Sequence, residues 1–322
     1  DLHPQHVVTL TWRSAELRWD TPAGGSALHA VAIPITCEGR MHAVLVLIRD
    51  QLSSEDAEER ALFHEIGSDL SHALTQMRQQ KRWLQDQESM RLHAAALDAA
   101  EQRHGVPAGI ITAIWGMESN YGGNFGSFSA VDALATLAYD GRRRDWARGE
   151  LLAALRIVDR GDIAADALVG SWAGAMGHTQ FLPSVYLAHA VDADGDGRRD
   201  IWGSVPDVLA STANFLAHSG WQAGQPWGVE VRLPPGFDYA RTELNVRQDS
   251  QAWALDGVRA VDGQPLPALP NAAIVTPAGA SGPAILVGPN FGALLRYNNS
   301  VNYALAVGLL ARQIDGGDGL LT

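Results

Sequence analysis

The hydrophobic pattern of this chain changes once, near residue 90, and the change limits the folds that it can adopt. Before it, the segments HAVAIPIT and HAVLVLI are typical of β-strands, and CEGR between them fits a tight hairpin turn with Gly39 at positive φ. After it, apolar residues recur at helical spacing and glycines separate the segments. We therefore predict an α+β chain in which a short α/β module precedes a larger, mainly helical domain.

The front part of the chain carries two more signals. VVTLTW at residues 7–12 is also strand-like, and LSSE at Leu52–Glu55 is a capping box that begins a helix running through Leu74. This order resembles the C-terminal half of a GAF-type sensory domain over roughly residues 25–85, so residues 1–75 are expected to form a partial GAF-like module. A full domain of that kind is longer and the ligand pocket would be incomplete here, so an inert packing or dimerising module is the favoured interpretation. The polar stretch 76–89 predicts a helical linker to a domain at 90–322.

Composition excludes some partners. The chain has 24 Lys+Arg against 36 Asp+Glu, a net charge of −12, which argues against a nucleic acid held through its phosphates. Cys37 is the single cysteine, so an intrachain disulfide is not expected. The longest apolar run, Ala43–Ile48, has the length of a strand, so we expect no transmembrane segment. The chain starts at Asp1 and shows no signal peptide.

The stretch Val106–Tyr121, VPAGIITAIWGMESNY, predicts a short helix with Pro107 at its first position. Glu118 stands four residues beyond Ile114, itself four beyond Ile110, so its carboxyl lies on the apolar face. Burial raises the pKa of a carboxyl and keeps it protonated near neutrality, as a general acid requires. A solvated glutamate at a helix end is the alternative interpretation.

Further segments complete the predicted domain. Helices are expected at 92–104, 131–138, 149–159, 208–218 and 302–313. Between about residues 227 and 290 the short runs VEVRL, AAIVT and AILV, broken by Pro and Gly, predict a small β-rich subdomain.

Three long motifs carry a resemblance to a known family. They read GMESNYGGNFGSFSAVDALATLAYDGRRR at 116–144, GSWAGAMGHTQFLPSVYLAHAVDADGDGRRDIW at 170–202 and NFGALLRYNNSVNYALAV at 290–307. Together they resemble the lytic murein transglycosylases of the B type. The resemblance implies a lysozyme-like helical domain that cleaves peptidoglycan glycan strands between MurNAc and GlcNAc and leaves a 1,6-anhydro-MurNAc end.

The resemblance also implies roles for individual residues. Glu118 matches the single catalytic acid/base of the family. Six other residues match positions that bind substrate in the cleft: Tyr121, Ser171, Gln180, Tyr186, Tyr297 and Asn298. No cofactor is required, and the periplasm or cell envelope is the implied location. A non-catalytic peptidoglycan-binding or sensory protein, or a hydrolytic muramidase, remains an alternative.

The segment DADGDGRRD at 192–200 matches the first half of a calcium-binding loop. Position twelve is Gly203, where a bidentate glutamate is expected, and the next acid is Asp207. The candidate ligands of a structural calcium are Asp192, Asp194, Asp196, Asp200 and Asp207. A loop of Asx turns without metal fits the same residues.

Overall fold

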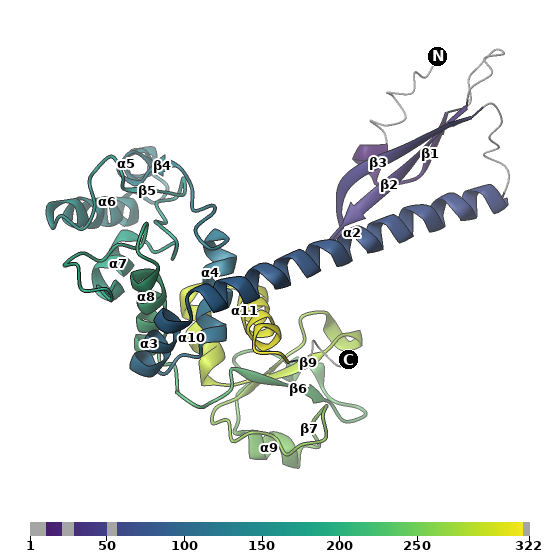
Figure 1. The fold of residues 1–322 in the computed structure, drawn as a ribbon. Helices are drawn as coiled ribbons and strands as arrows, with labels where there is room; N and C mark the ends of the chain where they lie inside the picture. Colours follow the sequence, from purple (N-terminus) through teal and green to yellow (C-terminus); the bar gives the residue numbers. More distant parts are fainter. Residues whose placement is uncertain (1–10, 21–28, 50–56, 318–322) are drawn as a thin grey trace. The chain divides into compact units, whose positions relative to one another are not determined.

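The computed structural model describes residues 11–20, 29–49 and 57–317 (Figure 1). The chain divides into two compact units, Asp1–Gln85 and Asp86–Thr322. Helix α2, Ala57–Leu92, runs through the point of division and includes the whole stretch 76–89. Within the ranges that the structure describes, no helix is both long and apolar enough to cross a bilayer.

The first unit contains a three-stranded antiparallel sheet in the order β1-β2-β3, with β1 at Arg18–Asp20, β2 at His29–Cys37 and β3 at Arg40–Arg49. Glu38 and Gly39 join β2 to β3 with φ values of 52° and 71°, as the hairpin prediction required of Gly39. Alternate residues of a strand face the same side. Val31 and Ile33 of β2 therefore both pack against Phe63 of α2 in a small core.

Two sequence predictions for the first unit fall partly or wholly outside the described ranges. Residues 11–14 form a helical turn, so the strand predicted at 7–12 is wrong at its described end, and residues 7–10 lie outside the described ranges. An apolar run of this length does not distinguish a strand from a buried helical turn by its period. The LSSE capping box also lies outside the described ranges.

The second unit is built on two pairs of packed helices, α4 against α11 and α3 against α8, with α10 beside them (Figure 1). Helices α5 and α6 pack on each other next to α7. The bounds are α3 Ala94–His104, α4 Ala108–Ser119, α5 Ala130–Asp140, α6 Arg144–Asp159, α7 Pro183–His189, α8 Val205–His218, α9 Ser250–Leu255, α10 Pro289–Tyr297 and α11 Val301–Ile314. A short ribbon of β4, Phe128–Ser129, and β5, Val169–Gly170, joins two of the connecting loops.

A four-stranded antiparallel sheet forms the predicted β-rich subdomain. Its order is β7-β6-β9-β8, with β6 at Gly228–Arg232, β7 at Arg259–Ala260, β8 at Ala273–Val275 and β9 at Ala284–Val287. Ile274 and Leu286 face a separate small core around Trp253, whereas Val275 and Ile285 face the helices. Because both faces are covered, β8 and β9 are continuous apolar runs.

Candidate active site

Helix α4 is enclosed on nearly all sides, because Ile110, Ile111 and Ile114 are all buried in the core of the second unit. A helix that is apolar all round is a buried helix. Pro107 is its N-cap, so the helix begins at Ala108, one residue later than the sequence predicted. At the other end Asn120 has φ 50°, in the left-handed region, and its N–H donates to the Gly116 carbonyl. Glu118 therefore lies in the final turn of a rigid, buried helix.

The Glu118 carboxyl is only partly exposed and has a specific partner. The Tyr303 hydroxyl, from the first turn of α11, donates a hydrogen bond of 2.6 Å to Glu118 Oε1. Burial raises the pKa of Glu118 above its ordinary value of 4.5, and the hydrogen bond from Tyr303 opposes part of that rise. Neither influence is a second carboxyl group, so within the described ranges Glu118 has no carboxylate partner at this place.

Tyr303 was not predicted as a site residue. It lies in the third motif, at 290–307, where the resemblance implied roles for Tyr297 and Asn298 only. Burial, followed by the Glu118 charge, raises the pKa of the Tyr303 hydroxyl, so this hydroxyl stays protonated and acts as a donor. The contact joins residues 185 positions apart, which is why no local pattern indicated it.

Tyr297 and Asn298 end helix α10. Burial, followed by the Glu118 charge, raises the pKa of Tyr297 well above its ordinary value, which places its hydroxyl within the electrostatic reach of the acid. That hydroxyl donates to the Thr179 carbonyl at 2.7 Å and so ties α10 to the second motif. Asn298 is the C-cap of α10, and its side chain is exposed.

Ser171 and Gln180 hold the glycine-rich loop between β5 and α7. The Ser171 hydroxyl oxygen accepts the N–H groups of Ala173 and Ala175 at 3.3 and 3.1 Å. Gln180 has φ 50°, and its Nε2 donates to the Phe125 carbonyl at 3.0 Å. The bond from Gln180 joins this loop to the segment that follows Glu118. Gln180 therefore fixes the two loops to each other, whereas Ser171 sets the shape of its own loop.

His178, to which the sequence assigned no role, packs against Trp115 and Gly122 on either side of Glu118 in the sequence. It is 8% exposed, and its Nδ1 accepts the indole N–H of Trp115 at 3.2 Å. A Cβ on Gly122 would lie 2.2 Å from the His178 ring, and Gly122 has φ 82°. Glycine is thus required there both by backbone conformation and by the close approach of the ring.

The other two predicted aromatic residues differ in position. The partly exposed Tyr121 packs edge-on against Trp115, with ring centroids 5.2 Å apart, and its hydroxyl donates to the Asp86 carboxylate. Tyr186 is fully buried, and its hydroxyl donates to the Arg199 carbonyl at 2.5 Å. The expectation that Tyr186 faces a sugar is therefore wrong, because its ring belongs to the core and its hydroxyl has an internal acceptor.

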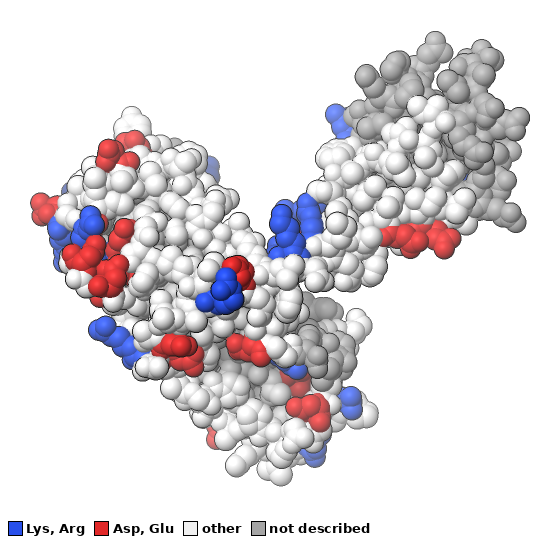
Figure 2. Space-filling view, in the orientation of Figure 1, with Lys and Arg blue, Asp and Glu red and all other residues white. Residues whose placement is uncertain are grey.

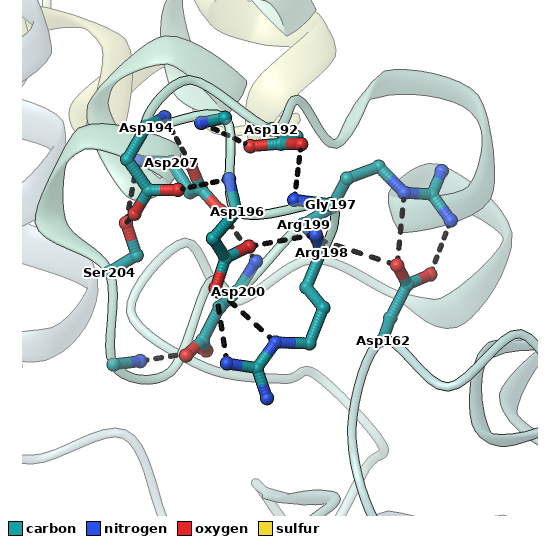
Figure 3. A network of polar contacts seen from close by, with 12 residues as sticks. Asp162, Asp192, Asp194, Asp196, Gly197, Arg198, Arg199, Asp200, Ser204 and Asp207 are labelled. Carbon is teal, nitrogen blue, oxygen red and sulfur yellow. Dashed lines mark hydrogen bonds and ion pairs between the residues drawn. The ribbon is translucent and has the colours of Figure 1, made fainter.

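The acidic loop at 192–200 forms a separate cluster (Figure 3). Carboxylate oxygens of Asp192, Asp194 and Asp196 lie within 4.8 Å of one another. They also accept hydrogen bonds inside the loop: Asp192 from the N–H groups of Gly195 and Gly197 at 2.7 and 2.9 Å, and Asp196 from the Arg198 N–H at 2.8 Å. These are the oxygens that a hard cation such as calcium takes as ligands, so three of the five predicted residues fit it.

The remaining two predicted metal residues lie outside that cluster. Asp207 is fully buried and accepts the N–H groups of Ala193 and Asp200, both at 2.7 Å. Asp200 Oδ1 accepts the N–H groups of Trp202 and Gly203 at 2.9 and 2.8 Å. Both carboxylates anchor the ends of the loop to the backbone. The structure therefore brings three of the five predicted aspartates together, and the ligand roles of Asp200 and Asp207 stay predictions.

Charged side chains form small separate groups of both signs on the face of the molecule shown in Figure 2. Glu118 differs from these surface groups. Its pKa is changed by burial and by the hydrogen bond from Tyr303. This arrangement can hold a proton on a carboxyl and deliver it to a basic atom that enters the site.

Comparisons with known proteins agree on one family. The family model described as "Transglycosylase SLT domain" matches residues 64–312. "Membrane-bound lytic murein transglycosylase B" of Escherichia coli (strain K12) is 36% identical over 227 residues, which are 68% of this chain and 60% of that protein.

Two solved structures show the likeness in three dimensions. SltB3 from Pseudomonas aeruginosa in complex with NAG-anhNAM-pentapeptide matches with a TM-score of 0.71 and 52% identity, over 74% of this chain and 66% of that one. The Escherichia coli lytic transglycosylase Slt35 in complex with calcium matches with a TM-score of 0.63 and 30% identity, over 80% of this chain and 87% of that one.

The chain spans about 60% of the length of the curated relative. The family model covers well over half of the chain, and the predicted α+β fold with a lysozyme-like, mainly helical domain is confirmed by the solved neighbours. The chain therefore belongs to the transglycosylase SLT domain family, as a member of its B type.

Proposed function

We propose that this chain is a peptidoglycan lytic transglycosylase that cleaves the β-1,4 bond between MurNAc and GlcNAc and forms 1,6-anhydro-MurNAc. The observation that carries the proposal is the partly buried Glu118 carboxyl, which has a raised pKa and accepts a hydrogen bond from Tyr303. Family membership, and the complex of the related SltB3 with NAG-anhNAM-pentapeptide, support a peptidoglycan glycan as the substrate of this carboxyl.

Glu118 acts twice in the proposed reaction. Protonated by virtue of its raised pKa, it donates its proton to the glycosidic oxygen as the bond to C1 breaks. The resulting carboxylate then takes the proton of the muramyl C6 hydroxyl while that oxygen bonds to C1, so Glu118 ends in its starting state. The Tyr303 hydroxyl stabilises the intermediate carboxylate, because a hydrogen bond to an ionised acceptor is stronger than one to a neutral acceptor.

A single carboxyl suffices because the nucleophile belongs to the substrate. Glycosidases that hydrolyse the bond need a second carboxylate. In inverting enzymes it activates water, and in retaining enzymes it attacks C1. An intramolecular hydroxyl is already close to C1 and needs only to lose its proton. Among the described residues no second carboxyl group influences the titration of Glu118, in agreement with this requirement.

The substrate is proposed to be a glycan strand, with the cell envelope as the location. Tyr121, Ser171, Gln180, Tyr297 and Asn298 are proposed to border the sugar path. Ser171 and Gln180 set the backbone of the loop through the hydrogen bonds described above. Tyr297 lies within the electrostatic reach of Glu118, and the exposed Asn298 follows it directly.

Mass spectrometry of purified sacculi digested with the protein tests the proposal. We expect muropeptides that end in anhydromuramyl residues, and we expect none with Glu118→Gln. Reducing ends would assign the chain as a hydrolytic muramidase instead. If neither the parent nor the variant released fragments while both sedimented with sacculi, the chain would be a non-catalytic peptidoglycan-binding protein.

We also propose that calcium binds at Asp192, Asp194 and Asp196 and stabilises the loop without taking part in the reaction. Support comes from the converging carboxylates and from the related Slt35 structure with calcium. The internal hydrogen bonds of the loop already hold it in shape, so we expect weak binding. Isothermal titration of chelator-treated protein with calcium chloride should give saturable heat, and its absence would leave a loop without metal.

A further inference from the structure

A pocket lies at the far end of the α4 and α11 pair from Glu118. It has a volume of about 310 Å³ and is lined by the start of α4, the end of α11, strand β6 and the loop that precedes β6. Pro107 belongs to its lining, and at 1.5 Å per helical residue it lies about 16 Å along α4 from Glu118. The pocket is therefore separate from the proposed catalytic centre.

Two tryptophans form part of the wall, and one has an unused donor. Trp221 is 9% exposed, and its indole N–H has no hydrogen-bond partner among the described residues. A buried donor without an acceptor costs about 1–3 kcal/mol, so such groups are rare unless something else binds them. Trp227 lies directly on α11, where a Cβ on Gly308 would come within 2.3 Å of its ring. Both tryptophans line the same pocket.

The loop that carries both tryptophans is held rigidly. The side chain of Asn290, which is fully buried, accepts the N–H of Gln222 at 2.6 Å and donates to the carbonyls of Gln222 and Gln225 at 3.0 and 2.6 Å. The segment from Trp221 to Trp227 is thus fixed at three points by one side chain. A wall fixed in this way is preorganised, which lowers the entropic cost of binding a ligand.

Polar groups of both kinds complete the pocket. Arg312 of α11 lines it, and within the described part of the chain no hydrogen bond or ion pair joins its guanidinium to another residue. Glu230 and Asp315 lie in the same lining. Aromatic surface beside the Arg312 guanidinium and two acidic residues suits a pyranose ring, which offers an apolar C–H face and hydroxyls that both donate and accept.

From these contacts we infer that this pocket is a second saccharide-binding site, which holds an N-acetylhexosamine unit of a glycan away from the bond to be cleaved. The inference rests on the proposed function, since it takes peptidoglycan glycan as the ligand. A glycan held at two places stays near Glu118 between cleavage events, because the second contact is made at a high effective concentration.

Fluorine NMR of protein labelled with 5-fluorotryptophan tests this site directly. Trp221 and Trp227 report on the pocket, and the exposed Trp172, beside Ser171, reports on the proposed cleft. We expect N,N′-diacetylchitobiose to shift the Trp221 and Trp227 signals in a saturable way. Arg312→Ala should weaken this binding about tenfold, as expected for one lost charge-assisted hydrogen bond.

Two further variants keep the test interpretable. Leu309→Phe fills the pocket from α11 and should abolish the shifts. Arg232→Ala removes an exposed arginine of β6 that does not line the pocket and should leave them unchanged. Equal affinity in the parent, Arg312→Ala and Leu309→Phe would overturn the inference.

The ligand class is tested in the same samples. Shifts at Trp221 and Trp227 with an acidic dipeptide, but not with chitobiose, would overturn the sugar assignment. So would a shift confined to Trp172. Formation of anhydromuramyl products from sacculi is measured separately, so failure of this site and failure of the proposed function remain distinguishable.

Discussion

Glu118 combines the two properties that the proposed general acid needs. Its position in the last turn of a buried helix raises its pKa, and the Tyr303 hydroxyl provides a donor when the proton has left. Both properties come from residues distant in sequence that α4 and α11 bring together by packing on each other. The chemistry therefore depends on the helix pair as much as on the acid.

Glu118→Gln is expected to stabilise the second unit at alkaline pH. The folded-state pKa of Glu118 is raised, so the carboxyl costs stability as pH rises through that pKa, whereas Gln stays neutral. In thermal unfolding, the free energy of unfolding of the variant should exceed that of the parent by about 1 kcal/mol at pH ~8. The two values should be equal at pH ~4. A variant that is less stable at every pH would show that the charged form is the favoured one.

Tyr303→Phe should move the alkaline limb of the activity profile to higher pH. The hydrogen bond from Tyr303 favours the charged carboxylate, so its loss raises the pKa of Glu118 further. At the same time kcat should fall about tenfold, because the intermediate carboxylate loses its donor. Tyr239→Phe, in the β-rich subdomain, is the matched control and should change neither. A lower kcat with an unmoved limb would assign Tyr303 a purely structural role.

At the scale of elements, the loop at 192–207 holds three proposed calcium ligands and a buried aspartate that anchors its backbone. Asp192, Asp194 and Asp196 converge, whereas Asp207 is buried and accepts backbone N–H groups from both ends of the loop. Sequence spacing placed all five aspartates in one candidate site, because a ligand set and an Asx-turn network use the same residues. Only the burial of Asp207 distinguishes them.

Asp207→Asn is expected to lower the free energy of unfolding of the second unit by about 2–3 kcal/mol, because an amide nitrogen would face backbone N–H groups in a buried place. The loss should be the same with calcium and with chelator. Asp196→Asn, at an exposed position of the loop, is the matched control and should reduce only the increase in stability that calcium brings. If Asp207→Asn lost more stability with calcium than with chelator, Asp207 would be a ligand.

Sequence patterns located most of the long elements. The runs AAIVT and AILV correspond to β8 and β9, and Gly105, with φ 68°, ends α3 as expected. Short helices such as α9, Ser250–Leu255, were not predicted, since a helix of one or two turns shows too little periodicity. Tyr186 was misplaced for a related reason, because a motif does not reveal which of its aromatic rings face inward.

At the scale of the whole molecule, the catalytic chemistry proposed here needs only the second unit. Its first residues belong to it through specific contacts: Asp86 accepts the Tyr121 hydroxyl, and Gln87 Nε2 donates to the Ile314 carbonyl at 2.9 Å. The first unit has its own small core around Val31, Ile33 and Phe63. A partial GAF-like module remains our proposal for its origin.

A chain of residues 76–322 is therefore expected to fold and to release anhydromuramyl fragments from sacculi at the rate of the full chain. The N-terminal turns of this shorter chain keep every contact that Asp86 and Gln87 make with the second unit. Circular dichroism and the release of fragments from sacculi check both parts. A folded but inactive protein would show that the first unit contributes to the reaction.

The central claim, that the fold holds a proton on Glu118, is tested most directly by a carbon-13 NMR titration of the glutamate carboxyl groups. The Glu118 signal is identified as the one missing in Glu118→Gln. We predict that it titrates clearly above 4.5, the ordinary value for glutamate. A Glu118 signal that titrates at or below 4.5 would contradict the account.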